Sequence, residues 1–265
     1  MTLLQAIIIA IVEGITEFLP ISSTGHMIIA QALLGVQPSE FVKAFTVIIQ
    51  FGAITSVLFL YWNRFFQSVD FYYKLIVAFI PAAIMGLLFG DLIDEMLEQV
   101  DIVAVSLMLG GWILIFSDKW FAKNLHSEEK PTTYKNAFFV GLFQCIALIP
   151  GVSRSAATMI GGMVNGWNRK QAAEFSFFLA VPTMFAASAK KTLDVVKIDY
   201  HIITDHAGIM LVGCVVAAVV AWLSIKYLMM ILQNKGFAYF GWYRVILGAI
   251  ILSLLMARVP LEIMG

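Results

Sequence analysis

The chain of 265 residues is far more hydrophobic than a soluble domain. Apolar residues make up 61% of it and charged residues only 13%, and the mean hydropathy is +0.90, which together indicate an integral membrane protein. Seventeen basic residues balance seventeen acidic ones, so no bulk charge favours nucleic acid or another charged polymer as a partner. We predict an all-α polytopic protein with a single membrane domain over residues 1–265.

Ten apolar stretches follow one another along the chain. Because a membrane-crossing helix needs about 20 mostly apolar residues, six stretches are long enough to cross. We predict these crossings near residues 43–62, 72–90, 102–118, 171–190, 207–227 and 240–257. The other four are too short, and they lie near residues 3–18, 22–35, 135–149 and 154–166. They are paired around Pro20 and Pro150, which mark turns, so we predict two re-entrant helix hairpins.

The two halves of the chain resemble each other. Shifting the sequence by 130 residues places Pro20 on Pro150 and Ser23 on Ser153, as in an internal repeat. The predicted repeats cover about residues 1–119 and 134–258. Each holds one hairpin and three crossings, an odd number, so the second repeat must be inserted upside down relative to the first. Inverted repeats of this kind place their binding sites near the midplane, so we expect the two hairpin tips to form one site.

Basic residues predict the orientation of the chain. Ten of them fall at one end of the predicted crossings, which the positive-inside rule makes cytoplasmic. They are Arg64, Lys74, Lys119, Lys123, Lys130, Lys135, Arg169, Lys170, Lys226 and Lys235. The opposite end receives both chain ends and an acidic run, Asp91, Asp94, Glu95, Glu98 and Asp101. Arg244 lies near a cytoplasmic span end, where we expect its side chain to extend toward the membrane surface.

The first hairpin contains two acids where a bilayer should hold none. A charged side chain at hydrocarbon depth costs roughly 2.5–3.5 kcal/mol, so such residues usually mark function. Glu13 and Glu17 are four residues apart, and a helix places both carboxylates on one face, where they need a cation or a proton. A divalent metal, Mg²⁺ or Ca²⁺, would satisfy both carboxylates and also bind phosphate. A helix end with two solvated acids is the alternative.

Hydroxyls and an imidazole follow Pro20. Ser22, Ser23 and Thr24 stand where a new helix can begin, so their hydroxyls and the free backbone N–H groups form a cradle for an anion or simply cap the helix. His26 lies three residues after Ser23, which allows its ring to reach the Ser23 hydroxyl and activate it as a nucleophile. The alternative is a histidine that only satisfies its neighbours.

The second hairpin tip contains an arginine without a charged partner in its own cluster. Arg154 stands between Ser153 and Ser155, just after a Pro-Gly turn that opens a helix. A guanidinium binds phosphate oxygens in bidentate fashion, and the helix N-terminus with its hydroxyls adds donors. A salt bridge from Arg154 to an acid of the first tip is the alternative. Thr158, one turn further on, either adds a donor or bonds to its own backbone.

Together the two tips supply the parts for phosphoryl transfer, which depends on positioning and charge neutralisation. The sequence has no Gly-x-x-x-x-Gly-Lys-[Ser/Thr] loop, so we expect the phosphate on a lipid or small molecule rather than on ATP. A polyprenyl-phosphate transporter or flippase that uses the same pocket is the rival function. Gln50 and Glu174 of the crossings are candidates for supporting the site, with a hydrogen bond between helices or a solvated helix end as the alternative. Gln144 of the second hairpin either contacts the phosphate or bonds to backbone across the hairpin.

At these residues the chain resembles a known family, the bacterial undecaprenyl pyrophosphate phosphatases, or bacitracin-resistance proteins. Its motifs are Glu-x-x-x-Glu leading to Ser-Ser-Thr-Gly-His, here from Glu13 to His26, and Pro-Gly-x-Ser-Arg-Ser-x-x-Thr, here from Pro150 to Thr158. The resemblance implies hydrolysis of a C55 isoprenoid pyrophosphate to its monophosphate, which recycles the carrier for peptidoglycan synthesis. It also implies a bacterial inner membrane protein whose active site opens to the extracytoplasmic side.

The resemblance further implies roles for individual residues. Glu13 and Glu17 match the family's metal-associated acids, Ser23 its candidate nucleophile, His26 its catalytic histidine and Arg154 its phosphate-binding arginine. Ser23 would pass its proton to His26 or Glu17 and attack the terminal phosphorus; direct attack by water is the alternative. The expected partners are the polyprenyl pyrophosphate substrate, membrane lipids and, in a homodimer, a second copy of the chain, with no nucleic acid among them.

Overall fold

The structure is a computed structural model that describes residues 1–65, 68–97, 99–124, 127–259 and 261. Glu98 of the acidic run lies outside these residues. Within them the chain is helical and contains no strand. Six helices are long and apolar enough to cross a membrane: α3 (Glu40–Leu60), α5 (Val69–Leu88), α7 (Val100–Trp120), α10 (Arg169–Ile198), α12 (Ala207–Lys235) and α13 (Ala238–Met256). Each coincides with a predicted crossing, which confirms a multi-pass membrane protein.

Four shorter helices form the two predicted hairpins: α1 (Leu3–Thr16), α2 (Ser23–Leu33), α8 (Tyr134–Ile146) and α9 (Arg154–Val164). The side chains of Thr2 and Thr133 cap the starts of α1 and α8 by accepting backbone N–H bonds. Each first helix ends a few residues before its proline. The remaining elements are short connections: α4 (Trp62–Phe65), α6 (Gly90–Leu97), a 3-10 turn at Ala122–Asn124, and α11 (His201–Thr204).

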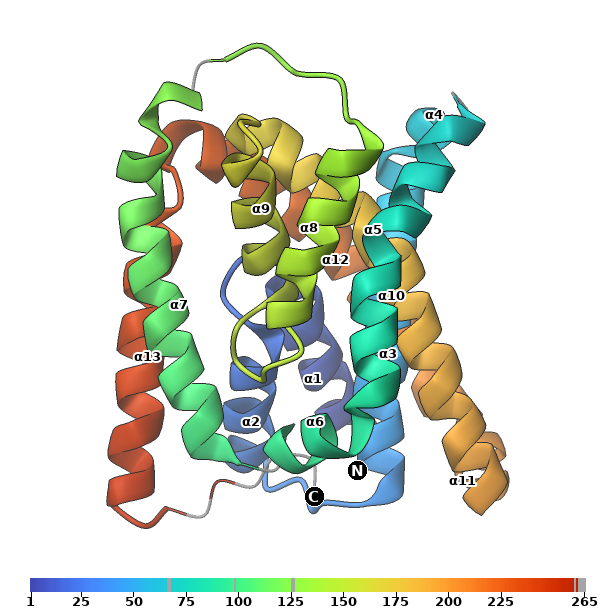
Figure 1. Cartoon of the computed structure of the whole chain (residues 1–265). Helices are drawn as coiled ribbons and strands as arrows, with labels where there is room; N and C mark the ends of the chain where they lie inside the picture. The colour runs from blue at the N-terminus through green and yellow to red at the C-terminus, as the bar shows by residue number, and fades with distance from the viewer. Residues whose placement is uncertain (66–67, 98, 125–126, 260, 262–265) are drawn as a thin grey trace.

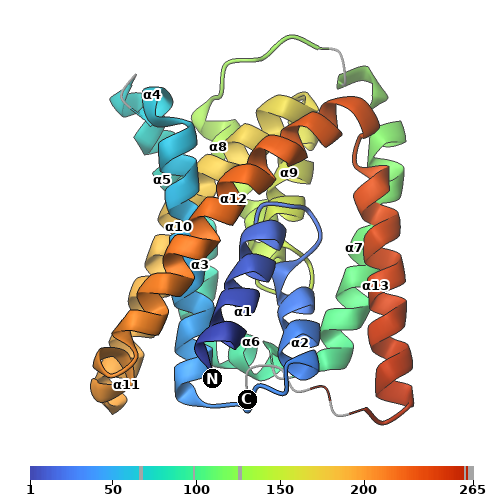
Figure 2. The ribbon, with the colours of Figure 1, turned by 180° about the vertical axis from the view of Figure 1, so that it is seen from behind.

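The two hairpins enter the bundle from opposite ends. In Figure 1, α1 and α2 rise from the lower end, where the N-terminus lies, whereas α8 and α9 descend from the upper end. Figure 2, seen from behind, shows the turn between α1 and α2 at mid-height beside the yellow tip of the second hairpin. Both tips therefore lie inside the bundle, between the crossing helices. The symmetry that would relate the two halves stays a prediction.

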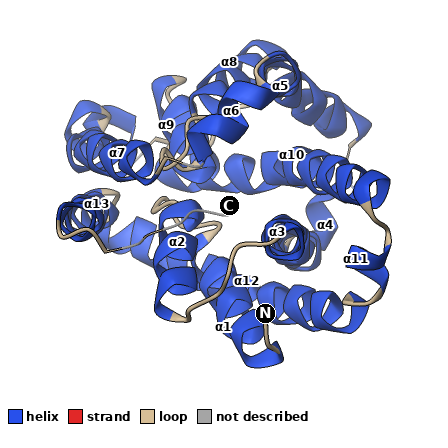
Figure 3. Cartoon of the chain, turned by 90° about the horizontal axis from the view of Figure 1, so that it is seen from below, coloured by secondary structure: helices blue, strands red, loops and turns tan. Residues whose placement is uncertain are grey.

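Each hairpin packs on a crossing helix of the other half of the chain. Helix α1 lies along α12, and α8 lies along α5 (Figure 3). Glycines make both contacts close: a side chain on Gly14 of α1 would meet the Ala217 carbonyl of α12 at 2.8 Å, and one on Gly141 of α8 would overlap the backbone of Ala78 on α5. Small residues let helix backbones approach in this way. The two halves are therefore interlocked rather than stacked side by side.

Candidate active site

The helix after each tip begins in the same unusual way. Ser22 precedes α2 with φ 66°, and Ser153 precedes α9 with φ 76°, a left-handed region that side chains other than glycine seldom adopt and that costs roughly 1–3 kcal/mol. Since Ser22 and Ser153 take the same structural position, Ser23 corresponds to Arg154. The expected match of Ser23 with Ser153 is therefore wrong by one residue, because the second tip has one residue more between its proline and its helix.

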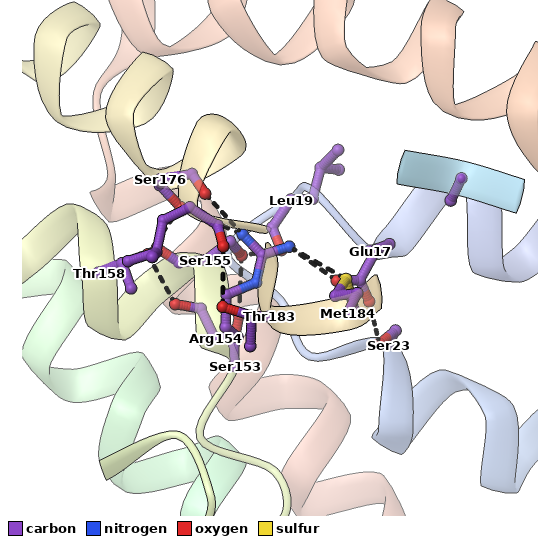
Figure 4. Close-up of polar contacts among 12 residues, drawn as sticks. Glu17, Leu19, Ser23, Ser153, Arg154, Ser155, Thr158, Ser176, Thr183 and Met184 are labelled. Carbon is purple, nitrogen blue, oxygen red and sulfur yellow. Dashed lines mark hydrogen bonds and ion pairs between the residues drawn. The ribbon is translucent and has the colours of Figure 1, made fainter. Parts of the chain in front are cut away.

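Glu17 connects the two tips. Arg154 Nη2 donates to Glu17 Oε1 at 2.8 Å, and the Ser23 hydroxyl donates to the other oxygen, Oε2, at 2.9 Å. Figure 4 shows Glu17 between the two side chains. The carboxylate is only 6% exposed, and a buried ion pair with hydrogen bonds of this length is strong because little water screens it. The structure thus brings the two predicted clusters into one site.

The rest of the Arg154 guanidinium is only partly satisfied. Nη1 donates to the Ser176 carbonyl at 3.0 Å, and the group lies 5.8 Å from the centre of the Phe18 ring. The Nε donor is buried and has no hydrogen-bond partner within the described part of the chain. Buried donors are almost always paired. Arg154 therefore has one unpaired donor among the described residues, while Glu17 binds another nitrogen of the guanidinium.

We expect His26 to reach the Ser23 hydroxyl, but in the structure its ring bonds to other groups. Its Nδ1 bonds to the Ser22 carbonyl at 2.8 Å, and because a carbonyl only accepts, Nδ1 carries the hydrogen. Its Nε2 bonds to the hydroxyl of Tyr243 at 2.7 Å, and the two rings are nearly parallel. His26 therefore fixes the strained backbone before Ser23, and the base in contact with Ser23 is Glu17. Sequence reasoning missed Tyr243, whose only signal is a tyrosine beside an arginine in an apolar crossing.

Two hydroxyls of the second tip that are candidates for binding phosphate are bonded within the protein. The Ser155 side chain is buried and donates to the Leu19 carbonyl of the first tip at 2.9 Å. Thr158, also buried, donates to the Arg154 carbonyl at 2.8 Å and bonds to the Ser176 hydroxyl at 2.6 Å. Neither lines the pocket. Their hydroxyls are occupied by bonds that join the tips and hold the backbone of Arg154.

A cavity of about 640 Å³ opens in front of this site, within the size range of small-molecule pockets. Six predicted site residues line it: Glu17, Ser22, Ser23, Thr24, Ser153 and Arg154. Gln50 and Gln144 line it as well. Gln144 is buried, and its Oε1 accepts a hydrogen bond from Thr183 at 3.2 Å. Lys190 and Asp94 stand among the lining residues near α6.

Glu13 lies on α1 one turn before Glu17 but does not line the cavity. It is fully buried, and neither carboxylate oxygen has a hydrogen-bond partner within the described residues. A buried carboxylate without partners requires a proton or a cation. No group of three or more metal-binding side chains gathers in the described ranges, so the protein offers two carboxylates. That donor set fits Mg²⁺ or Ca²⁺, which complete their shells with water and phosphate oxygens.

Glu174 is the one predicted supporting residue that the structure leaves outside the pocket. It lies in the first turns of α10, where Arg64 Nη2 approaches its carboxylate at 3.4 Å and Lys170 at 4.0 Å. Lys170 also bonds to Glu129 at 2.8 Å, which lowers the pKa of the Glu129 carboxyl. These residues form a charge cluster at the upper end of the bundle. Glu174 of α10 therefore pairs with Arg64 of α4, so it connects two helices instead of lining the pocket.

Arg244 is the largest departure from expectation. Its side chain does not extend toward the membrane surface but is fully buried. Its guanidinium donates to the carbonyls of Pro20 in the first tip and of Gly151 and Val152 in the second, at 3.3, 2.9 and 2.8 Å. It also donates to two carbonyls of α7, on Ser106 and Leu107. Arg244 thus binds both tips to α7 and α13, and the backbone carbonyls replace the water that a charge would otherwise need.

A family model described as "Bacitracin resistance protein BacA" matches residues 6–250. The chain belongs to this family. Relatives named undecaprenyl-diphosphatase include one from Flavobacterium johnsoniae, 52% identical over 99% of this chain and 100% of the relative. One from Bdellovibrio bacteriovorus is 54% identical over 96% and 97%, and one from Aquifex aeolicus is 44% identical over 94% and 97%. The family match contains the whole site, from Glu13 to Arg244.

Proposed function

We propose that this chain is a membrane phosphatase that hydrolyses undecaprenyl pyrophosphate to undecaprenyl phosphate and inorganic phosphate, and so recycles the lipid carrier of cell-wall synthesis. The observation that carries the proposal is the Ser23 hydroxyl held against the Glu17 carboxylate, which Arg154 binds from its other side. A transporter needs the arginine and the acid to bind a phosphate, but it gains nothing from a hydroxyl aligned with a base. The names of the relatives support the same function.

The proposed reaction uses contacts that already exist. Ser23 Oγ attacks the terminal phosphorus while its proton passes to Glu17; the bond from that phosphorus to the bridging oxygen breaks, and its electron pair leaves with undecaprenyl phosphate. Protonation removes the charge of Glu17, so Arg154 is released to bind the oxygens of the transferred phosphoryl group. Water then hydrolyses the phosphoserine, and the proton returns to Ser23. In the alternative, Ser23 and Glu17 orient a water molecule that attacks directly.

Glu13 and Glu17 would hold the divalent metal, Mg²⁺ or Ca²⁺, in this proposal. The ion supplies positive charge that neutralises the pyrophosphate oxygens. Neither Glu13 carboxylate oxygen has a hydrogen-bond partner in the described chain, which supports a role for Glu13 as the permanent ligand. His26 and Tyr243 keep the backbone at Ser22 in place, so that the Ser23 hydroxyl stays on Glu17.

The proposal places the enzyme in the bacterial inner membrane with its pocket open to the extracytoplasmic side. Two features support this orientation. The basic loops gather at one end of the bundle, which the positive-inside rule assigns to the cytoplasm. The cavity is lined near its mouth by Asp94 and Lys190, which lie close to α6 at the opposite end. A negatively charged headgroup would therefore reach Arg154 from the outer surface.

Phosphate release tests the proposal. Purified protein in detergent should release inorganic phosphate from a long-chain prenyl pyrophosphate, and Ser23→Ala should reduce kcat by roughly 10²-fold or more while lipid binding persists. Ser253→Ala, which removes an exposed hydroxyl of α13, is the matched control and should have the wild-type rate. Lipid binding without phosphate release by the wild type would establish a transporter. A near-normal rate in Ser23→Ala would exclude the phosphoserine and leave direct attack by water.

A further inference from the structure

Helices α5 and α10 are splayed apart, whereas the pair that the predicted repeat relates to them, α12 and α3, is tightly packed. Helix α12 lies close against α3, because a side chain on Gly52 of α3 would meet the backbone of Cys214 at only 2.5 Å. The 130-residue shift of the predicted repeat relates α3 and α12 to α10 and α5, and Gly52 to Pro182. Few contacts join α5 to α10, and Pro182 faces a cavity. The looser packing of α5 against α10 leaves a space between these helices.

An apolar groove of about 400 Å³ lies in this gap, between α3, α5 and α10. Of the side chains that line it, only Thr55 and Tyr72 are polar, and both hydroxyls are occupied: Thr55 donates to the Gly52 carbonyl at 2.6 Å and Tyr72 to that of Phe65. No lining group in the described structure is left to recognise a polar ligand. The groove therefore suits a hydrocarbon.

The groove and the catalytic pocket share the same helix walls. On α5, Tyr72, Leu75 and Ile76 line the groove, and the next residue of that face, Phe79, lines the pocket. Their spacing of three and four residues follows one face of a helix. On α10, Pro182 of the groove is followed directly by Thr183 of the pocket. The two cavities thus lie end to end along α5 and α10.

We propose that this groove, which we call the chain groove, binds the part of the prenyl chain that follows its first two isoprene units; the inference rests on the proposed function. With its headgroup at Arg154, a 55-carbon chain cannot fit in a pocket of about 640 Å³. Apolar side chains such as Phe79 and Leu87 also line the pocket, so the first isoprene units can lie there, whereas Asp94 and Lys190 disfavour a chain that leaves the pocket past α6. The chain groove is apolar, and its rim is open to the lipid at Ile76 and Phe185, which are 49% and 58% exposed. The remaining chain would continue into the bilayer between α5 and α10.

Filling the chain groove should harm long substrates selectively. Ile76→Trp places a large ring at the open rim, where partial exposure allows the protein to fold, and Ile80→Trp, 43% exposed on the same helix but outside both cavities, is the matched control. We expect Ile76→Trp to lower kcat/KM about tenfold for a C55 prenyl pyrophosphate and much less for a C10 one, with Ile80→Trp unchanged. Equal losses for both lengths, or no loss, would overturn the proposal.

Photolabelling gives a readout that does not require turnover. A long-chain prenyl pyrophosphate with a diazirine just beyond its second isoprene unit, bound to the wild-type protein and irradiated, should label α3, α5 or α10 at residues of the chain groove. Labels confined to α7, α12 or α13 would refute the groove. Phosphate release by the wild type is measured alongside, so a phosphatase whose chain lies elsewhere is distinguished from a protein that is not a phosphatase.

Discussion

Replacing Arg244 by methionine removes a buried side chain that joins both hairpin tips, while roughly keeping its volume. Three of its five carbonyl partners, on Pro20, Gly151 and Val152, lie outside helices and would stay buried without a donor. Each unsatisfied buried group costs about 1–3 kcal/mol, so the change should destabilise the protein by about 3–9 kcal/mol. Arg244→Lys keeps the charge but loses the planar fork of donors, so its stability should lie between that of the wild type and that of Arg244→Met.

Thermal unfolding in detergent measures this effect. For soluble domains of comparable size, 1 kcal/mol corresponds to about 2–4 °C in Tm, so Arg244→Met should lower Tm by about 6 °C or more. Arg64→Met is the control: Arg64 is 47% exposed and Lys170 remains beside Glu174 without it, so its loss should cost less than about 1 kcal/mol. Phosphate release from the Arg244 variants should fall below what the folded fraction explains, because the tips hold Ser23 and Arg154.

An unchanged Tm and rate in Arg244→Met would refute the argument that this arginine holds the tips together. A lower Tm with a normal rate per folded molecule would show that Arg244 stabilises the tips but does not set the alignment of Ser23 and Arg154. Rescue by Arg244→Lys is expected to be partial in both measurements.

Three further predictions concern the site itself. Tyr243→Phe removes the hydroxyl bonded to His26 and should lower kcat about two- to tenfold, the worth of one hydrogen bond, with little change in Tm; an unaltered rate would remove Tyr243 from the site. Thr158→Val leaves the Arg154 carbonyl and Ser176 without this partner, so KM should rise and Tm should fall, whereas an unchanged KM would contradict the positioning role. Chelation with EDTA should stop phosphate release and added Mg²⁺ or Ca²⁺ should restore it, with Glu13→Gln requiring more metal; a rate indifferent to chelation would exclude the metal.

The crossings and hairpins could be predicted from the sequence because hydrophobic length is a local property. Every predicted helix is present, with ends that differ mostly by a few residues, although α10 and α12 extend eight residues further than predicted, to Ile198 and Lys235. In α10 the extra turns carry Lys191, Asp194 and Lys197, which end a hydropathy window but not a helix. In α12 they stay apolar as far as Leu232. The clusters at Glu13–His26 and Pro150–Thr158 were recognised because charge in an apolar chain stands out.

The partners of the site residues could not be predicted in the same way. His26 is close to Ser23 in sequence, but the ring direction is set by Tyr243 on α13, more than two hundred residues away. Arg244 near a span end looks like any residue that reaches toward the surface, and only the meeting of two tip turns supplies the carbonyls that hold it inside. Spacing along a helix predicts on which face of the helix a residue lies. The groups that contact this face are determined only when the two tips assemble.

The interlocked packing of the hairpins has a consequence for how the chain is made. Helix α1 is among the first segments to leave the ribosome, yet the surface it covers belongs to α12, which begins at Ala207. At about 5–20 residues per second, roughly 10–40 s of synthesis separate the two. During that time the first hairpin, with Glu13 and Glu17, has to wait in the translocon or at the lipid interface. Two separately expressed halves, divided in the loop between α7 and α8, should therefore be degraded alone and become stable only when they are produced together.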